Sequence, residues 1–258
     1  MPQHSAAKPI GLPFIELLSV DSTNNYARRQ IHAGLAQHGV AFFAQEQLEG
    51  KGQRGRTWST EKGANIILSL VLNPSPLQLT QQFQLSACVA TVVRDFFSRY
   101  AGEGTKIKWP NDLYWQDRKA GGILIENIIS GQKAPDGKRT WTSIVGIGIN
   151  INQTSFPAEL PNPVSLRQIT GRAFDTALLA KELCSLLDAR FRQLTDDGFA
   201  DIFHAYSSHL YKKNQFVRLR KEGRVFEAKI VGVSLEGKLM TQHRLEQEYS
   251  FTDVEWVL

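Results

Sequence analysis

The chain has 258 residues, of which 42% are hydrophobic and 21% charged, and its formal net charge is +5. These values are ordinary for a soluble globular protein, and the mild positive charge permits acidic partners without requiring nucleic acid. No apolar run approaches the roughly 20 residues of a membrane-spanning helix, and residues 1–14 lack a signal-peptide core, so we expect a cytoplasmic protein without a membrane partner.

Helix and strand signals alternate through the N-terminal part of the chain. Polar residues at 21–23 offer N-caps for a helix that ends at Gly34. The segment 40–47 predicts a strand, and the apolar run Ile66–Leu72 predicts a second, buried strand. An apolar stripe of helical period then predicts a long helix over 79–100.

Strand signals dominate the middle of the chain, at 106–115, 121–130 and 143–151. The short, polar separators between these segments favour antiparallel hairpins over βαβ crossovers. Helical patterns follow over 176–194 and 199–210.

The character of the sequence changes after residue 211. Short strand patterns alternate with the turn signals Glu222-Gly223 and Glu236-Gly237. A segment of about 45 residues with this pattern predicts a small β-barrel that docks on the main domain. We therefore predict two domains, 1–211 and 212–258.

The most distinctive segment is a loop of glycines and cations between the second and third predicted elements. It contains Gly50, Lys51, Gly52, Arg54, Gly55 and Arg56. Glycines let a backbone pass close to a bulky anion, and the cations can hydrogen-bond phosphate or carboxylate oxygens. The pattern therefore predicts a loop that closes over a nucleotide or an acyl-phosphate, with a solvated basic loop as the alternative.

Two familiar phosphate-binding motifs match the sequence of this loop but not its predicted secondary structure. Gly50-x-Gly52-x-x-Gly55 matches the dinucleotide fingerprint, and residues 50–57 match a P-loop with Arg56 at the lysine position. Both motifs need a helix immediately after the glycines, whereas the strand Ile66–Leu72 follows here. A kinase is excluded because the chain has no HRD and no DFG motif.

Two further clusters carry chemistry. Lys106 and Lys108 alternate with apolar residues and so share one face of a strand, which Pro110 bends or ends. Gly146 and Gly148 lie inside a strand pattern, where glycine often marks close approach of a ligand or of another backbone. A hairpin with solvated lysines and a strand with packing glycines are the respective structural alternatives.

Together these motifs resemble those of biotin protein ligases. STN, GKGQRGRTW, KWPNDLY, RKAGGILIE and VGIGIN occur in the order and rough spacing of that family. The resemblance covers essentially the whole chain. It implies an α+β fold, with a mixed, largely antiparallel sheet flanked by helices as in class II aminoacyl-tRNA synthetases, plus a C-terminal SH3-like barrel.

The resemblance also implies an activity. Members activate biotin with ATP to biotinyl-5′-AMP and transfer it to a lysine of a biotin carboxyl carrier protein, a part of acetyl-CoA carboxylase or a related carboxylase. Cations are needed because a carboxylate must attack an α-phosphate, and Mg²⁺ would neutralise the departing pyrophosphate. No enzyme nucleophile is required, which agrees with Cys88 and Cys184 lying in apolar helical patterns as buried, reduced thiols.

Residue roles follow from the same resemblance. Those implied on the biotin side are Ser22, Thr23, Gln47, Gly50, Lys51, Gly52, Gln53, Lys119, Gly121 and Gly122. Those implied for ATP and the adenylate are Gly55, Trp58, Asn111 and Asn150, with Asp112 near Mg²⁺. Lys108, Arg54 and Arg56 are the implied catalytic residues, Lys108 contacting both the biotin carboxylate and the phosphate.

The glycine loop departs from the family's usual GRGRRGR pattern. Lys51 keeps the charge of the arginine it replaces but not its bidentate fork, and Gln53 is neutral. An arginine at the Gln53 position helps family members to retain the reactive adenylate. Our hypothesis is that retention in this chain relies more on Lys51, Arg54 and Arg56.

Partners and alternatives complete the expectations. About 20 residues precede the STN segment, too few for a three-helix DNA-binding module, so we expect a monofunctional ligase with no DNA partner. The carrier could add a strand to a sheet edge, and a homodimer stays open because many relatives dimerise through such edges.

Two alternative functions remain. One is a lipoate ligase, which the polar Ser22, Thr23 and Gln47 disfavour because sulfur accepts hydrogen bonds only weakly. The other is a non-catalytic nucleic-acid-binding protein, which would show a steep salt dependence of binding and no turnover.

Overall fold

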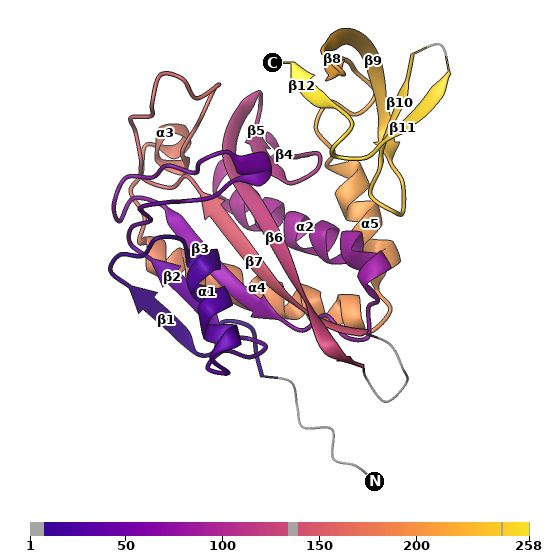
Figure 1. Cartoon of the computed structure of the whole chain (residues 1–258). Helices are drawn as coiled ribbons and strands as arrows, with labels where there is room; N and C mark the ends of the chain where they lie inside the picture. The colour runs from indigo at the N-terminus through magenta and orange to yellow at the C-terminus, as the bar shows by residue number, and fades with distance from the viewer. Residues whose placement is uncertain (1–7, 134–138, 244, 258) are drawn as a thin grey trace.

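A seven-stranded sheet forms the centre of the molecule, as the computed structural model in Figure 1 shows for residues 8–133, 139–243 and 245–257. The strand order is β1-β2-β3-β7-β6-β5-β4. Only β1 and β2 pair in parallel, and every other neighbouring pair is antiparallel. The strands are β1 (Phe14–Leu17), β2 (Ala41–Ala44), β3 (Ile66–Leu72), β4 (Thr105–Lys108), β5 (Asp112–Trp115), β6 (Arg118–Lys133) and β7 (Arg139–Ile149). The predicted mixed, largely antiparallel sheet is confirmed.

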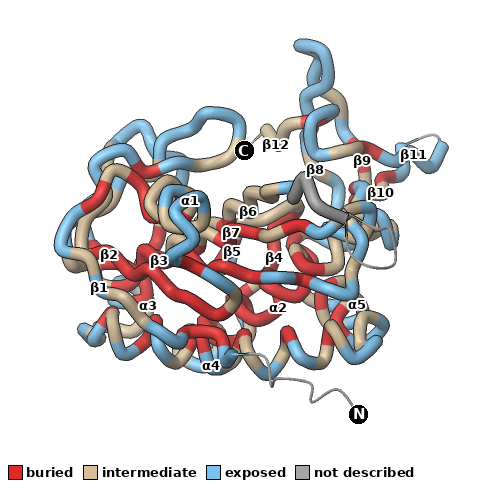
Figure 2. The backbone as a smooth tube through the Cα atoms, turned by 60° about the horizontal axis from the view of Figure 1, so that its bottom comes forward, coloured by how far each residue is buried: buried red, intermediate tan, exposed pale blue. Residues whose placement is uncertain are grey.

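Helices cover both faces of this sheet (Figures 1 and 2). The long helices α2 (Gln82–Ala101) and α4 (Thr176–Thr195) pack together on one face, joined by α5 (Phe199–Ser208). Helix α1 (Thr23–His32) contacts β3 and β7 from the other face, and the short α3 (Leu166–Thr170) packs near α2. Among the described residues no helix is long and apolar enough to cross a membrane.

The central strands are apolar on both sides because both faces of the sheet are covered. All seven residues of β3 are buried. Leu68 and Leu70 belong to the large core on the α2 and α4 side, whereas Val71 belongs to the smaller core under α1. A continuous apolar run was therefore the correct signal for this strand.

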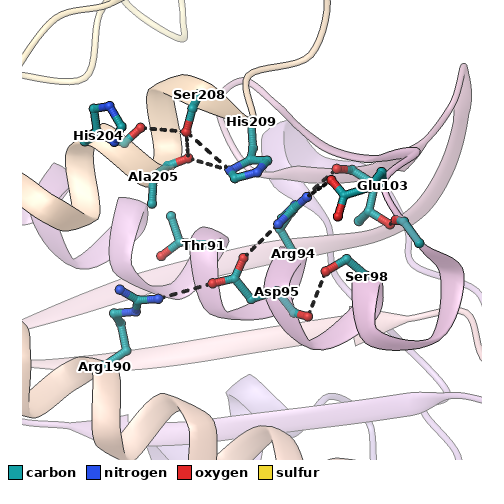
Figure 3. Close-up of polar contacts among 12 residues, drawn as sticks. Thr91, Arg94, Asp95, Ser98, Glu103, Arg190, His204, Ala205, Ser208 and His209 are labelled. Atoms are coloured by element: carbon teal, nitrogen blue, oxygen red, sulfur yellow. Dashed lines mark hydrogen bonds and ion pairs between the residues drawn. The ribbon is translucent and has the colours of Figure 1, made fainter.

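A polar network fastens α2 to its neighbours on the helical face (Figure 3). Arg94 is only 7% exposed, and its Nε donates to the carbonyl oxygen of Thr105 on β4 at 3.2 Å. Its guanidinium also lies 3.1 Å from Asp95 and 3.3 Å from Glu103. Asp95 in turn accepts from Arg190 of α4 at 3.2 Å. A buried guanidinium is tolerable only with such partners, so the network fixes α2 against β4 and α4.

The C-terminal segment forms an open sheet rather than the predicted barrel. Its order is β11-β10-β9-β8-β12, all antiparallel, and within the described part of the chain the outer strands β11 and β12 do not pair. Closing a barrel requires its first and last strands to pair. Here β12 is three residues long and, among the described strands, pairs with β8, so the barrel prediction is wrong. The strands are β8 (Phe216–Lys221), β9 (Arg224–Val233), β10 (Leu239–Gln242), β11 (Glu246–Tyr249) and β12 (Glu255–Val257).

The open sheet docks on the main body through a turn and a shared core. The indole Nε1 of buried Trp109 donates to the carbonyl oxygen of Gly237 at 2.9 Å. A Cβ on Gly237 would lie 2.4 Å from the Phe83 ring of α2. One apolar cluster includes Leu219 and Ile230 together with Tyr206 of α5. The core thus continues across residue 212, and a domain boundary there stays a prediction.

Most predicted elements are confirmed, and the differences are local. The segment 106–115 is a hairpin, β4–β5, whose turn contains Pro110, and the strand predicted over 40–47 spans only Ala41–Ala44. Ser22 is the N-cap of α1, but its side chain makes no capping hydrogen bond. Strand β1 was not predicted because four residues carry little periodicity. Helix α3 was also missed, although Ser165 and Gln168 form a capping box that the sequence displays.

We predict that Gly237→Ala destabilises the protein more than Gly223→Ala. Both glycines have positive φ (87° and 79°), but only Gly237 faces the Phe83 ring, and at Gly223 no atom of the described residues other than its chain neighbours lies within 4 Å of the place that a methyl group would occupy. Positive φ alone should cost about 1–2 kcal/mol of unfolding free energy in each variant. Overpacking against Phe83 should add about 1–3 kcal/mol in Gly237→Ala, measured by urea unfolding. Equal losses in the two variants would show that this turn does not pack on α2 in solution.

Candidate active site

A cavity of about 600 Å³ opens where the central strands, the glycine loop and the C-terminal sheet meet. The structure brings all but three of the predicted site residues to its wall. The predicted residues that line the cavity are Ser22, Thr23, Gln47, Lys51, Gly52, Gln53, Arg54, Arg56, Trp58, Lys108, Asn111, Asp112, Lys119, Gly122 and Asn150. Glu255 and Trp256 of the C-terminal sheet also line the cavity, so segments more than 200 positions apart share one site.

The three exceptions are glycines with backbone reasons of their own. A Cβ on Gly50 would lie 2.1 Å from the carbonyl oxygen of Trp58, across the base of the loop. A Cβ on Gly121 would lie 2.7 Å from the carbonyl oxygen of Gly148 on the neighbouring strand. Gly55 has open space around it but a φ of +73°, which side chains rarely adopt.

Lys108 is the most unusual charged group of the site. It ends β4 and is 6% exposed. Its Nζ donates to the hydroxyl of Tyr114 at 3.2 Å and lies between the rings of Tyr114 (4.8 Å) and Trp256 (5.1 Å). Burial lowers the pKa of this ammonium to about 8; nearby Asp112 opposes the shift, and the charges of Lys119 and Arg56 add to it. A desolvated cation aimed at an anionic ligand acts strongly because little water screens it.

The glycine loop is held between α1 and the C-terminal sheet. Lys51 Nζ donates to Asn25 Oδ1 of α1 at 2.8 Å. Arg54, with a φ of 56°, donates to Glu255 Oε1 of β12 at 3.1 Å and to the carbonyl oxygen of Val254 at 3.3 Å. The loop therefore bridges the cavity, and one of its arginines is engaged by the protein itself.

Trp58 lies against a glycine of β7. A Cβ on Gly148 would come within 2.6 Å of the indole, so only glycine leaves room for the ring at this point. Lys119 Nζ lies 5.9 Å from the centre of the same ring. The indole Nε1 is buried and has no hydrogen-bond partner among the described residues. Trp58 thus offers an apolar platform and an unused donor.

Asp112 and Glu255 are the carboxylates that the described residues contribute to the cavity wall, and each is paired with a cation. Asp112 Oδ1 lies 2.7 Å from Lys119 Nζ, and Glu255 holds Arg54. No group of three or more His, Cys, Asp or Glu side chains able to hold a metal occurs in the described ranges. Mg²⁺ commonly takes one or two carboxylates plus substrate phosphates. Asp112 therefore fits Mg²⁺ as a single ligand that acts together with a nucleotide.

The two predicted carboxamides have their amino groups engaged by the backbone. Asn150 Nδ2 donates to the carbonyl oxygens of Val164 (3.2 Å) and Lys119 (3.4 Å). Asn111 Nδ2 donates to the carbonyl oxygen of Ile123. Both amide hydrogens of Asn150 are thereby engaged, so a ligand would find its carbonyl oxygen, whereas Asn111 uses one of its two donors.

Several cavity residues escaped the sequence reasoning. Tyr114 could have been found, because on a strand it shares a face with Asp112 two positions earlier. Glu255 and Trp256 could not, since only the docking of β12 brings them to Lys108 and Arg54. Lys106, expected on the face of Lys108, is not part of the cavity wall that the structure describes.

Comparisons with known proteins place the chain among characterised relatives. Residues 17–150 match the sequence model of the biotin/lipoate A/B protein ligase family. The chain is 34% identical over 226 residues to the bifunctional ligase/repressor BirA of Bacillus spizizenii, covering 85% of this chain and 67% of that protein. It is 34% identical over 203 residues to the biotin–[acetyl-CoA-carboxylase] ligase of Paracoccus denitrificans, covering 74% of this chain and 78% of that one. The biotin protein ligase from Aquifex aeolicus in complex with biotin and ATP superposes with a TM-score of 0.77 at 26% identity, over 93% of this chain and 97% of that chain.

We predict that Lys108→Met stabilises the protein at pH 7. The ammonium loses its proton near pH 8 in the folded chain and near 10.5 in the unfolded chain. Between these values the unfolded state binds more protons, so the wild-type free energy of unfolding rises with pH through this window. Below pH 8 the buried charge costs on the order of 3 kcal/mol, which methionine does not incur.

Urea unfolding at pH 7 and pH 9.5 measures this effect. The stability advantage of Lys108→Met should be largest at pH 7 and shrink at pH 9.5. A variant less stable than wild type at pH 7 would show that the ring and hydroxyl contacts of Lys108 outweigh its desolvation.

Proposed function

Since the chain belongs to the biotin/lipoate A/B protein ligase family, we propose that it is an ATP-dependent biotin protein ligase. It activates biotin to biotinyl-5′-AMP and transfers biotin to a lysine of a biotin carboxyl carrier protein, within acetyl-CoA carboxylase or a related carboxylase. The observation that carries the proposal is the buried Lys108 ammonium at a cavity whose other walls supply a cationic glycine loop and a polar end. The cytoplasm is the proposed compartment.

The two ends of the cavity suit the two substrates. The polar end of the cavity, formed by Ser22, Thr23 and Gln47, suits the ureido ring of biotin. The dithiolane ring of lipoate would leave these polar side chains without hydrogen-bond partners. Trp58, whose indole donor has no partner among the described residues, supports the adenine end. The lipoate alternative has no comparable observation in its favour.

Lys108 lines the same cavity and supports the first step. The biotin carboxylate and the α-phosphate of ATP repel one another, and a desolvated ammonium that faces both lowers this barrier. Arg56 and Arg54 add positive charge from the loop. Mg²⁺, bound with the nucleotide and held on the protein side by Asp112, would neutralise the phosphates. Asp112 Oδ1 forms an ion pair with Lys119 at 2.7 Å, which holds the carboxylate in the cavity wall.

The second step needs no nucleophile from the enzyme. A neutral acceptor amine attacks the acyl carbon of the mixed anhydride, and AMP leaves with the bonding electron pair. Cys88 and Cys184 are both buried, and burial raises the pKa of each thiol to about 12, which keeps them unreactive. The covering loop protects the anhydride from water.

Pyrophosphate exchange into ATP tests the function, run with biotin, with lipoate and with neither acid. We expect exchange only with biotin. Lys108→Ala should lower the exchange rate roughly 10²–10³-fold, as expected for loss of one charge-stabilising group. Exchange driven by lipoate would show that biotin is the wrong ligand. A loss below about fivefold in the variant would contradict the role proposed for Lys108.

We also predict that Arg54→Ala raises leakage of biotinyl-5′-AMP into solution. With Gln53 neutral, Arg54 is one of three loop cations left to retain the intermediate, and its pair with Glu255 holds the loop over the cavity. The measurement is the ratio of free adenylate to biotinylated acceptor. Arg218→Ala, which removes a solvent-exposed arginine of β8 away from the cavity, is the control. An unchanged ratio in Arg54→Ala would contradict the hypothesis.

A further inference from the structure

A buried polar chain lies directly behind the polar end of the cavity. It links α1 to β3 and β6 through Thr23, Asn24, Ser69 and Glu126. Thr23, Asn24 and Ser69 are buried, and Ser69 is 0% exposed. Polar groups at such depth cost free energy unless each finds a partner. Their mutual hydrogen bonds therefore constrain one another, and the positions of their protons can be followed from the charged end.

The carboxylate of Glu126 fixes the first amide. Its Oε1 accepts from Arg28 at 2.8 Å, and its Oε2 accepts from Asn24 Nδ2, also at 2.8 Å. The same Nδ2 donates to the carbonyl oxygen of Leu124 at 3.3 Å. Because both partners are acceptors only, Asn24 must point its nitrogen toward β6 and its Oδ1 toward Ser69.

The orientation of Asn24 then determines which way the hydroxyls of Ser69 and Thr23 donate. Ser69 Oγ lies 2.6 Å from Asn24 Oδ1 and 2.8 Å from Thr23 Oγ1, and it has one proton. Asn24 Oδ1 cannot donate, so the proton of Ser69 lies on that side. Thr23 must then donate its own proton to Ser69 Oγ or to Gln47 Oε1, which is 3.0 Å away. Either way Thr23 Oγ1 keeps only lone pairs for a ligand.

Gln47 is oriented by the same segment. Its Oε1 accepts the backbone N–H of Thr23 at 2.7 Å, so its amide nitrogen is directed away from Thr23. The cavity end therefore presents an acceptor, Thr23 Oγ1, and a donor, Gln47 Nε2. This pair is complementary to a ring that carries an N–H beside a C=O.

A glycine of β7 makes room for the chain. Gly146 pairs with Ser69 on one side and with Leu124 on the other. A Cβ on Gly146 would lie 2.5 Å from Asn24 Oδ1, so any larger residue would displace the amide. The glycine noted inside this strand pattern thus accommodates the polar chain and is also part of the cavity wall.

We infer that Ser69 and Asn24, anchored by Glu126, are positioning residues that set the specificity of the pocket for a cyclic urea by fixing the donor and acceptor of Gln47 and Thr23. The inference rests on the proposed function, since the urea is that of biotin. Neither Ser69 nor Glu126 lines the cavity, so both act through the residues that do.

Ser69→Ala tests the inference, with Ser143→Ala as the matched control. Ser143 is also 0% exposed, lies on β7 of the same sheet, and donates to Asn127 Oδ1 at 2.9 Å, away from the cavity. In biotin-dependent pyrophosphate exchange, Ser69→Ala should raise the KM for biotin about tenfold, the loss expected for one oriented hydrogen bond. The KM for ATP and kcat should stay within about twofold of wild type, and Ser143→Ala should change none of these values.

Further measurements separate positioning from folding. Desthiobiotin keeps the urea but lacks the thioether ring, so its KM should rise by the same factor in Ser69→Ala. Ser69→Cys, whose thiol is somewhat larger and donates weakly, should fall between wild type and alanine and serves if the alanine variant does not fold.

The outcomes distinguish this inference from the proposed function. Equal effects of Ser69→Ala and Ser143→Ala, or parallel rises in the KM for biotin and for ATP, would overturn the positioning role alone. Absence of biotin-dependent exchange in the wild-type protein would overturn the proposed function and the inference with it.

Discussion

The buried ammonium of Lys108 is the constraint around which the site is arranged. A cation at this depth needs a hydroxyl or aromatic faces to compensate for lost water, and it receives both from Tyr114 and Trp256. Tyr114 comes from the next strand of the same hairpin, but Trp256 comes from the C-terminal sheet. The position of that sheet is therefore part of the site's electrostatics, and Trp109 and Gly237 fasten it there.

The sheet contributes to the site through glycine backbone as well as through side chains. Along β7, Gly146 accommodates the amide of Asn24, and Gly148 accommodates the indole of Trp58. One glycine serves the polar end of the cavity and the other its aromatic platform. A glycine inside a strand normally lowers the stability of that strand, because it has no side chain to pack. Here the β3 and β6 neighbours hold the strand in place, so it can do without these two side chains.

Local patterns predicted those parts of the fold whose stability is local. The apolar run of β3, the stripe of α2 and the short separators of the hairpins each placed an element correctly, because burial on a regular element imposes its own period. Strand β1 has four residues and depends on pairing with β2, so it left no such trace. The barrel prediction failed for a related reason: strand patterns do not reveal whether the outermost strands meet.

The motifs and their chemistry are written in the chain: the glycine loop, the lysine of the KWPND hairpin and the polar residues at 22, 23 and 47 can all be recognised in the sequence alone. Contacts between distant segments cannot. The pair Arg54–Glu255 spans 201 positions, and the chain from Glu126 to Thr23 spans about 100. Such contacts leave no periodic signal, since their partners are set by how α1 and β12 dock. Tertiary packing alone therefore decided how deeply Lys108 is buried and which atoms of the pocket donate or accept.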